Sequence, residues 1–219
     1  MRSWGKFLPD YRIMRWDEST FDIKSSIFTE QAYENKKWAF VADYVRLWAL
    51  REYGGIYLDT DVEIVRPIDN LLSYNAFGGY ETDNVIQTGI IGSVRDGRFI
   101  NMMFDYYKNL PFVTADGNLN QEPNSAIFAR ILSAAGISTC NERSSSELIE
   151  MFPSQYFCPI NQATWEIRPT PETYCIHYLS GSWLPSKDRF SRRLKSLIGR
   201  TFGFGIVTRL RSIFRKVYK

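Results

Sequence analysis

Two aspartates stand two positions apart in an otherwise apolar stretch, GGIYLDTDVEIV, which runs from Gly54 to Val65. Burying one unpaired carboxylate is costly, and two neighbouring carboxylates also repel each other. Residues two apart in an extended chain project to the same side, so Asp59 and Asp61 can address one ligand. A divalent cation would cancel their repulsion and offset their desolvation. We therefore predict a metal site, with a surface turn as the plainer alternative.

Three other residues are candidates for the same site. Asp43 and Arg46 are three positions apart on a predicted helix just upstream and share one face of it. An ion pair on the helix surface is the plainer interpretation of this pair. His177 is the only histidine of the chain and lies in an apolar, strand-like run, CIHYLSGSWLP. A neutral imidazole commonly binds transition metals, although a lone histidine is more often a packed residue.

The stretch FVADYVRLWALREYGGIYLDTDVEIVRPID, from Phe40 to Asp69, resembles the DXD-containing glycosyltransferases of family 32. That group includes bacterial capsule and lipopolysaccharide sugar transferases, and fungal mannosyltransferases and the glucosyltransferase domains of clostridial toxins are related to it. Its signature is a helix with A-D-x-x-R followed by Y-G-G-x-Y-L-D-x-D, which is far more specific than D-x-D alone. The similarity continues through FPSQYFCP and IHYLSGSWLP, to about Pro185.

The resemblance implies an α/β fold of the GT-A type, with the D-x-D motif at the end of a central strand of the nucleotide-sugar-binding sheet. By this resemblance Asp61 coordinates Mn²⁺ or Mg²⁺ at the donor diphosphate, and Asp59 contacts the donor sugar or ribose and the metal. The other implied site residues are Asp43, Arg46, Tyr57 and Trp183 at the donor, His177 at the metal, and Gln87 in the acceptor or sugar pocket.

The implied reaction transfers a hexose from a UDP- or GDP-linked sugar to a bacterial surface polysaccharide or a lipid-linked glycan. The metal and Arg46 would stabilise the negative charge on the departing β-phosphate. The resemblance suggests retention of the anomeric configuration, by attack of the acceptor hydroxyl on the same face.

Two other functions compete with transfer. Family members usually begin with a strand of the type IPKIIHYCWFGG, whereas this chain opens with MRSWGKFLPDYRI, so we expect that strand to be absent. A catalytically degenerate transferase that binds a glycan or a protein partner is therefore an alternative. A phosphohydrolase of the haloacid dehalogenase type is disfavoured, because Asp61 is followed by Val62 and Glu63 and not by a D-x-D-x-T continuation.

Strands alternate with helices along the chain, which is the pattern of an α/β layer fold. The predicted strands are Asp10–Trp16, Ile56–Val65, NAFGGYE, VIQTGIIGS, FPSQYFCP and YCIHYL. The predicted helices are Thr29–Tyr53, which Gly54 and Gly55 end, Arg98–Leu110 and Ser125–Ala135.

Length, cysteine content and the absence of long apolar runs indicate the size of the core and the cellular compartment. The 219 residues suffice for one sizeable core. Three cysteines without C-x-x-C spacing favour a reducing environment. The sequence contains no run of eighteen or more apolar residues, so we predict no membrane-spanning helix. The first residues lack the apolar core of a signal peptide. We expect a cytoplasmic protein.

The charge is distributed unevenly. Residues 187–219 hold eleven lysines and arginines and one acid, Asp188, whereas the remaining chain holds sixteen basic and twenty-three acidic residues. We predict a transferase domain over residues 1–186 and a basic amphipathic appendage over 187–219. The appendage is expected to associate peripherally with the anionic inner face of the plasma membrane, with a solvated terminal helix as the plainer alternative. Nucleic acid is disfavoured as a partner because the basic residues share these helices with Leu, Ile and Phe.

Overall fold

The computed structural model of this chain describes residues 2–181. Trp183 and the predicted appendage, residues 187–219, lie outside the described residues. The helices are α1 (Arg2–Phe7), α2 (Ile27–Glu34), α3 (Trp38–Tyr53), α4 (Arg98–Tyr106), α5 (Asn124–Ala134) and α6 (Ser154–Phe157), with 3-10 helices η1 (Ile23–Ser25) and η2 (Asp69–Ser73). The strands are β1 (Gly55–Leu58), β2 (Val62–Ile64), β3 (Ala76–Thr82), β4 (Val85–Ser93), β5 (Ser144–Ser145), β6 (Glu150–Phe152), β7 (Ile160–Asn161), β8 (Glu166–Ile167) and β9 (Cys175–His177).

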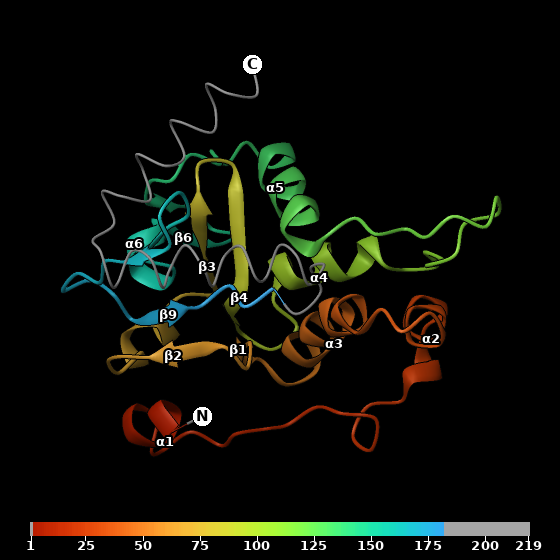
Figure 1. The fold of residues 1–219 in the computed structure, drawn as a ribbon, viewed down its shortest axis with the longest axis horizontal. Helices are drawn as coiled ribbons and strands as arrows, with labels where there is room; N and C mark the ends of the chain where they lie inside the picture. Colours follow the sequence, from red (N-terminus) through yellow and green to blue (C-terminus); the bar gives the residue numbers. More distant parts are fainter. Residues whose placement is uncertain (1, 182–219) are drawn as a thin grey trace.

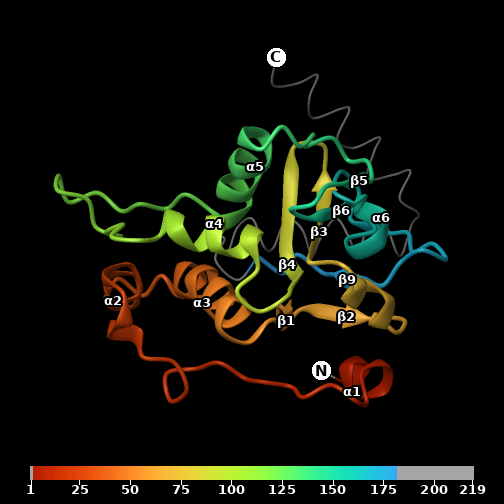
Figure 2. The ribbon, with the colours of Figure 1, turned by 180° about the vertical axis from the view of Figure 1, so that it is seen from behind.

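A mixed five-stranded sheet forms the centre of the molecule, with α4 and α5 to one side of β3 and β4 and α6 to the other (Figure 1, Figure 2). Its strand order is β1-β4-β3-β6-β5, and only β3 and β6 run parallel. The α/β fold predicted from the sequence is confirmed, and the mixed sheet agrees with the GT-A type.

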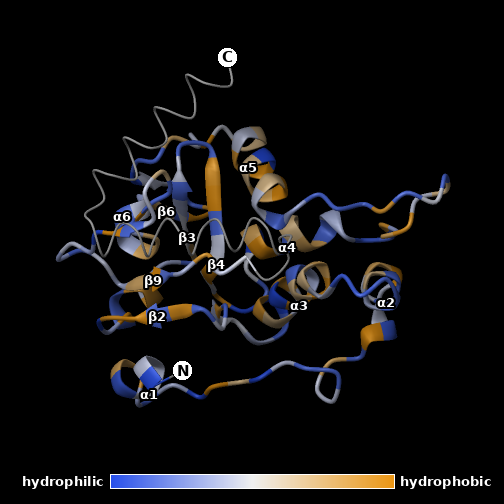
Figure 3. Ribbon diagram, viewed as in Figure 1, coloured by the Kyte–Doolittle hydropathy of each residue, from blue (hydrophilic) through white to orange (hydrophobic). Residues whose placement is uncertain are grey.

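The central strand β4 shows why the sheet forms. It is buried along almost its whole length, and Figure 3 shows much of it as hydrophobic. One apolar cluster packs α2 to α5 against the sheet, and a second packs α1, β2 and α6 around the other strands. Burial of both faces is what a strand between two helical layers requires. The predicted strands NAFGGYE and VIQTGIIGS are confirmed as β3 and β4.

The stretch that carries the two aspartates is not the single strand that we predicted for Ile56–Val65. It forms β1, which pairs with β4 in the central sheet, and β2, which pairs antiparallel with β9 in a separate two-stranded sheet. The aspartates occupy the turn between them, where the Val62 N–H donates to the Asp59 carbonyl at 3.1 Å. The chain thus changes pairing partner at the D-x-D motif. Asp59 and Asp61 belong to neither strand, so their carboxylates lie outside both sheets' hydrogen-bonded pairs.

The predicted helix Thr29–Tyr53 is two helices, α2 and α3. Between them Lys36 takes φ +57°, a left-handed conformation that ends α2, and the Lys37 N–H donates to the Ala32 carbonyl at 2.8 Å. The spacing of apolar residues predicted one continuous helix because the same hydrophobic pattern continues in α3 after the break.

Two predicted strands are also wrong. Asp10–Trp16 contains no strand, because the described residues offer it no ladder partner. In the segment FPSQYFCP only the first residue, Phe152, belongs to a strand, β6. After Pro153 the chain closes one helical turn, α6, with the Cys158 N–H donating to the Ser154 carbonyl at 2.7 Å. No helix between residues 2 and 181 is long and apolar enough to cross a membrane.

Candidate metal and donor site

Arg46 is the centre of a buried network that begins on α3. Its side chain is 6% exposed, and Nη2 lies 3.0 Å from Asp43 Oδ1 and 3.6 Å from Asp59 Oδ1. Nη1 donates to the Thr88 carbonyl of β4 at 2.6 Å, and the guanidinium lies over the Tyr57 ring, 4.7 Å from its centre. The pair Asp43–Arg46 is therefore not an ion pair of an exposed helix face. It fixes a positive charge beside the D-x-D motif.

The protonation states in this network follow from burial and from Arg46. Burial raises the pKa of Asp43, and the charge of Arg46 offsets this only in part. Burial alone would lower the pKa of Arg46, but Tyr57, Asp59 and Asp43 together raise it well above its ordinary value. Arg46 is thus a permanent cation.

The two aspartates meet His177 in space. His177 Nε2 lies 3.3 Å from Asp61 Oδ1 and 3.7 Å from Asp59 Oδ2. Register accounts for this, because Val62 pairs with His177 across β2 and β9 and so brings residue 177 next to the motif. One ligand atom from each of the three residues lies within 4.8 Å of the other two. The surface-turn alternative does not explain this convergence of three ligand atoms.

Each aspartate is held by a neighbour. The Tyr57 hydroxyl donates to Asp59 Oδ1 at 2.5 Å, and the Ser180 N–H donates to Asp61 Oδ2 at 2.8 Å. Partial burial raises the pKa of Asp61, but the hydrogen bond and charge of His177 and the Ser180 N–H outweigh this and hold it well below its usual range. Asp61 is therefore ionised at any pH at which the protein works.

These residues fit a divalent cation. Two donor atoms at right angles, each about 2.1 Å from one ion, are about 3 Å apart, which is close to the observed spacing between imidazole and carboxylate atoms. Two carboxylates and one imidazole are a donor set that suits Mn²⁺ and also admits Mg²⁺.

Two contributions were missed from the sequence. The Asn124 N–H, at the start of α5, donates to Asp43 Oδ2 at 3.3 Å, and its Nδ2 donates to the Asp43 carbonyl at 2.9 Å. The Gly89 carbonyl of β4 accepts from the Asp59 N–H at 2.8 Å. Asn124 lies 81 residues from Asp43, and Gly89 contributes only its backbone carbonyl. Neither contact could therefore be recognised from the residue types in the sequence.

Comparisons with known proteins find a match for the part of the chain that carries most of this site. Residues 1–78 match the model described as "Glycosyltransferase sugar-binding region containing DXD motif". This part of the chain, residues 1–78 of 219, is therefore similar to the sugar-binding region of DXD glycosyltransferases. The matched region contains five of the site residues, Asp43, Arg46, Tyr57, Asp59 and Asp61, whereas His177 lies beyond it.

Two curated relatives of this chain are yeast proteins. It is 29% identical over 120 residues to mannosyl phosphorylinositol ceramide synthase SUR1 of Saccharomyces cerevisiae, covering 50% of the chain and 31% of the relative. It is 31% identical over 107 residues to inositol phosphoceramide mannosyltransferase 3 of Schizosaccharomyces pombe, covering 47% of the chain and 29% of the relative. The matches thus span less than a third of each relative's length.

Among solved structures, the PaToxG glycosyltransferase is similar at 19% identity and a TM-score of 0.39, over 56% of this chain and 45% of that one. A likeness at that score carries no argument about function.

The candidate site opens into a cleft of about 1300 Å³. Its walls include the extended segment around residues 11–17, parts of α3 and β1, and the D-x-D turn with His177. Ligand sites in proteins commonly occupy about 300–1,000 Å³, so the cleft has room for a donor and more.

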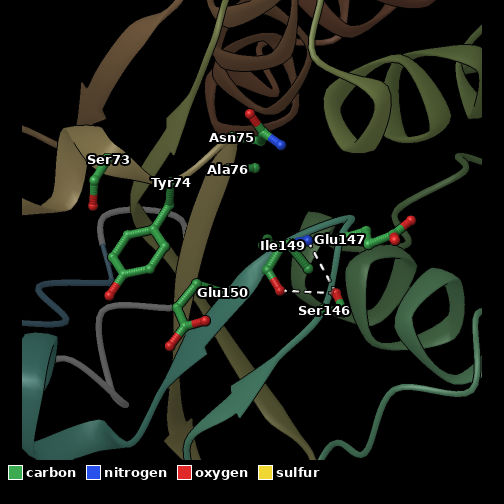
Figure 4. Close-up of a pocket in the computed structure, with 8 residues that line it drawn as sticks. All are labelled: Ser73, Tyr74, Asn75, Ala76, Ser146, Glu147, Ile149 and Glu150. Atoms are coloured by element: carbon green, nitrogen blue, oxygen red, sulfur yellow. Dashed lines mark hydrogen bonds between the residues drawn. The ribbon is translucent and has the colours of Figure 1, made fainter.

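A second pocket, shown in Figure 4, is much smaller, at about 170 Å³, and lies at the start of β3 and β6. Its polar groups bond to their neighbours: the Ser146 hydroxyl donates to the Ile149 carbonyl at 2.9 Å, and Glu150 pairs with Arg143 at 2.6 Å. It is too small for a nucleotide sugar.

Gln87 lies elsewhere than we predicted. Its side chain is fully buried on β4, where Oε1 accepts from the Ile90 N–H at 2.9 Å, and it is not among the residues that line the cleft. Because its side-chain oxygen accepts a hydrogen bond from the backbone, Gln87 stabilises the strand and does not face a sugar acceptor in the cleft. Trp183 was predicted to close over the donor and stays a prediction.

Proposed function

We propose that this glycosyltransferase moves a hexosyl group from a UDP- or GDP-linked donor to a hydroxyl of a glycan, in a reaction that depends on a divalent cation. The observation that carries the proposal is the convergence of Asp59, Asp61 and His177 beside the buried Arg46, at the wall of a large cleft. Both yeast relatives bear names of mannosyl transfer, so GDP-mannose is the first donor to test. A surface polysaccharide or a lipid-linked glycan is the proposed acceptor.

Asp59, Asp61 and His177 would hold Mn²⁺ or Mg²⁺, which when bound neutralises charge on the departing diphosphate. Arg46 adds a second positive charge that needs no reorganisation during the reaction, because Asp43 and the Thr88 carbonyl already fix its guanidinium. Tyr57 keeps Asp59 oriented through its hydroxyl. These residues bind and orient the donor and stabilise its leaving group.

We also propose retention of configuration, without a covalent intermediate on a carboxylate. The described carboxylates around Arg46 are already engaged: Asp43 by Arg46 and Asn124, Asp59 by Tyr57, and Asp61 by Ser180. Attack by the acceptor hydroxyl on the face that the diphosphate leaves needs none of them as a nucleophile. The anomeric configuration of the first product, read by proton NMR, tests this.

The decisive variant is Asp61→Asn, which keeps the shape of the side chain and removes its charge. We expect Mn²⁺ affinity to fall by about two orders of magnitude, because carboxylate oxygens dominate the affinity of such sites. Release of nucleoside diphosphate from a panel of UDP- and GDP-sugars should be lost with it. Isothermal titration with Mn²⁺ and a coupled diphosphate assay measure the two quantities.

The matched control is Asp105→Asn, which removes an exposed carboxylate of α4 that does not line the cleft. It should leave both quantities unchanged. An Asp61→Asn enzyme whose turnover still responds to Mn²⁺ would refute the metal assignment. A folded wild-type protein that binds no sugar nucleotide would favour the degenerate, glycan-binding alternative.

A further inference from the structure

Three side chains line the cleft but take no part in the donor site: Glu81, Gln162 and Trp165. Glu81 comes from the end of β3, and the other two come from the turn that joins β7 to β8. Because strands far apart in sequence bring them to one cleft, they form a second set of polar and aromatic groups beside the metal and donor residues.

Glu81 and Gln162 form a polar pair. Gln162 Nε2 donates to Glu81 Oε2 at 3.0 Å, with the glutamine exposed and the glutamate half-buried. An amide next to a carboxylate presents donor and acceptor atoms side by side, which suits the two hydroxyls of a vicinal diol. A diphosphate would meet repulsion from Glu81, so the pair selects an uncharged hydroxyl-bearing ligand.

Trp165 is held in an unusual backbone conformation. Its φ is +63°, which is rare for a bulky residue, and the Trp165 N–H donates to the Asn161 carbonyl at 2.6 Å. The ring packs against the apolar cluster of Cys158, Ile160 and Ile176 and stays half-buried. The turn therefore presents a rigid aromatic surface at the wall of the cleft.

This set lies near the metal residues. The Cys158 thiol donates to the His177 carbonyl at 3.7 Å, and Cys158 packs in the same cluster as Trp165. Glu81 and Trp165 also line the same cleft as Asp61 and His177. An acceptor bound at Glu81 would therefore occupy the same cleft as the metal residues.

We infer that Glu81, Gln162 and Trp165 form the acceptor subsite of this glycosyltransferase and that its ligand is a sugar or cyclic polyol ring. The C–H face of the ring stacks on Trp165, and two neighbouring hydroxyls bond to Glu81 and Gln162. The inference rests on the proposed function. In the transfer, the acceptor oxygen bonds to the anomeric carbon, the bond from that carbon to the diphosphate breaks, and the hydroxyl proton leaves with the diphosphate.

The test separates acceptor binding from donor turnover. Two soluble probes, methyl α-D-mannopyranoside and myo-inositol, are offered to the full chain with Mn²⁺ and the sugar nucleotide that the wild type hydrolyses best. Hydrolysis of the donor by water reports the donor site alone. The KM for each probe and saturation-transfer NMR signals from its ring protons report the acceptor subsite.

Glu81→Gln and Trp165→Ala should each raise the KM for at least one probe about tenfold, the effect of one lost hydrogen bond or stacking contact, while donor hydrolysis stays within twofold. Trp165→Phe keeps an aromatic face and should restore most of the affinity. Asp83→Asn, a carboxylate on the same hairpin that does not line the cleft, is the matched control and should behave as the wild type.

The outcomes are distinguishable. If the wild type hydrolyses its donor but gives no saturation transfer to either probe, or if both variants keep the wild-type KM, the acceptor subsite is wrong and the proposed function stands. If the wild type binds neither Mn²⁺ nor any sugar nucleotide, the proposed function fails and the inference fails with it.

Discussion

Gly89 lies under the imidazole ring of His177 in the middle of β4. A Cβ atom built at this position would lie 2.6 Å from Cε1, 2.7 Å from Nδ1 and 2.9 Å from Nε2 of the ring. The absence of a side chain therefore lets the ring lie flat against the strand, where Nε2 reaches the carboxylates. The same residue also accepts the Asp59 N–H, so one glycine positions two of the three predicted metal ligands.

We predict that Gly89→Ala weakens Mn²⁺ binding about tenfold or more, because the methyl group displaces the His177 ring from Asp61. Titration calorimetry measures the affinity, and urea unfolding measures stability. Gly79→Ala is the control, since its Cβ would lie 2.6 Å from the Phe157 ring in the same sheet, away from the carboxylates. It should lose comparable stability and keep its Mn²⁺ affinity.

A double-mutant cycle completes this test. In a His177→Ala background Gly89→Ala should have no further effect on Mn²⁺ affinity, because the ring through which it acts is gone. Additive losses would show that Gly89 acts by another route.

Arg46→Lys keeps the charge but cannot reproduce the planar contacts with Asp43, the Thr88 carbonyl and the Tyr57 ring. We predict a loss of about 1–3 kcal/mol in the free energy of unfolding, the range for an unsatisfied buried group. Arg46→Ala should cost about 3–5 kcal/mol, because it leaves Asp43 buried without its partner. Urea denaturation measures both, and the exposed Arg98→Lys should change stability little.

At the scale of elements, the site depends on a change of pairing partner that local sequence does not encode. The apolar run around the motif predicted extended chain, which is correct, but its two halves join different sheets. The partner residues lie about 30 and 115 positions away, at Gly89 and His177. Periodicity reports which face is buried and not against which strand.

The residues of the site were nevertheless predictable where chemistry and spacing were local. Asp59 and Asp61 came from their own motif, and Asp43 and Arg46 from one helix face. Asn124 was not predictable, because it serves through its backbone N–H and an amide that bonds to the Asp43 carbonyl. Such contacts depend on tertiary packing that one sequence does not reveal.

Helix α1 braces β2 directly after the D-x-D motif. Trp4 is 6% exposed, and its Nε1 donates to the Val62 carbonyl at 2.8 Å. We predict that Trp4→Ala lowers the free energy of unfolding by about 3–5 kcal/mol, the usual cost of removing a buried large aromatic side chain. Thermal and urea unfolding measure this change.

Trp38→Ala is the matched control, because Trp38 is 52% exposed at the start of α3. It should cost less than about 1 kcal/mol. Equal losses in the two variants would mean that α1 does not stabilise the fold through Trp4.

At the scale of the whole molecule, charge divides the chain more sharply than secondary structure does. Residues 187–219 carry a formal charge of +10, from eleven basic residues and one acid, and residues 1–186 carry −7, from sixteen and twenty-three. The α/β class followed from the alternation of predicted strands and helices, because each element is indicated by the pattern of many residues. The cleft did not, because its walls join the segment around residues 11–17 to strands far along the chain.

We propose that the protein is located in the cytoplasm and at the inner face of the membrane, and residues 187–219 allow this to be tested. Each basic residue near an anionic surface contributes about 1 kcal/mol, and the apolar residues of 187–219 would add burial at the interface. The full chain should float with vesicles that contain phosphatidylserine, whereas a chain ending at residue 186 should not. Binding should weaken as ionic strength rises, since the attraction is screened.

Two charge-reversal variants sharpen this experiment because they change net charge equally. Arg192→Glu with Arg193→Glu alters the basic segment, whereas Lys24→Glu with Lys36→Glu alters exposed positions of the body. If the segment itself docks on lipid, only the first variant should reduce flotation, because only charges held near the surface lie within a Debye length of about 10 Å at 0.1 M salt. Equal reductions would instead indicate a response to overall charge, and recovery of the chain ending at residue 186 with the vesicles would refute the membrane role of 187–219.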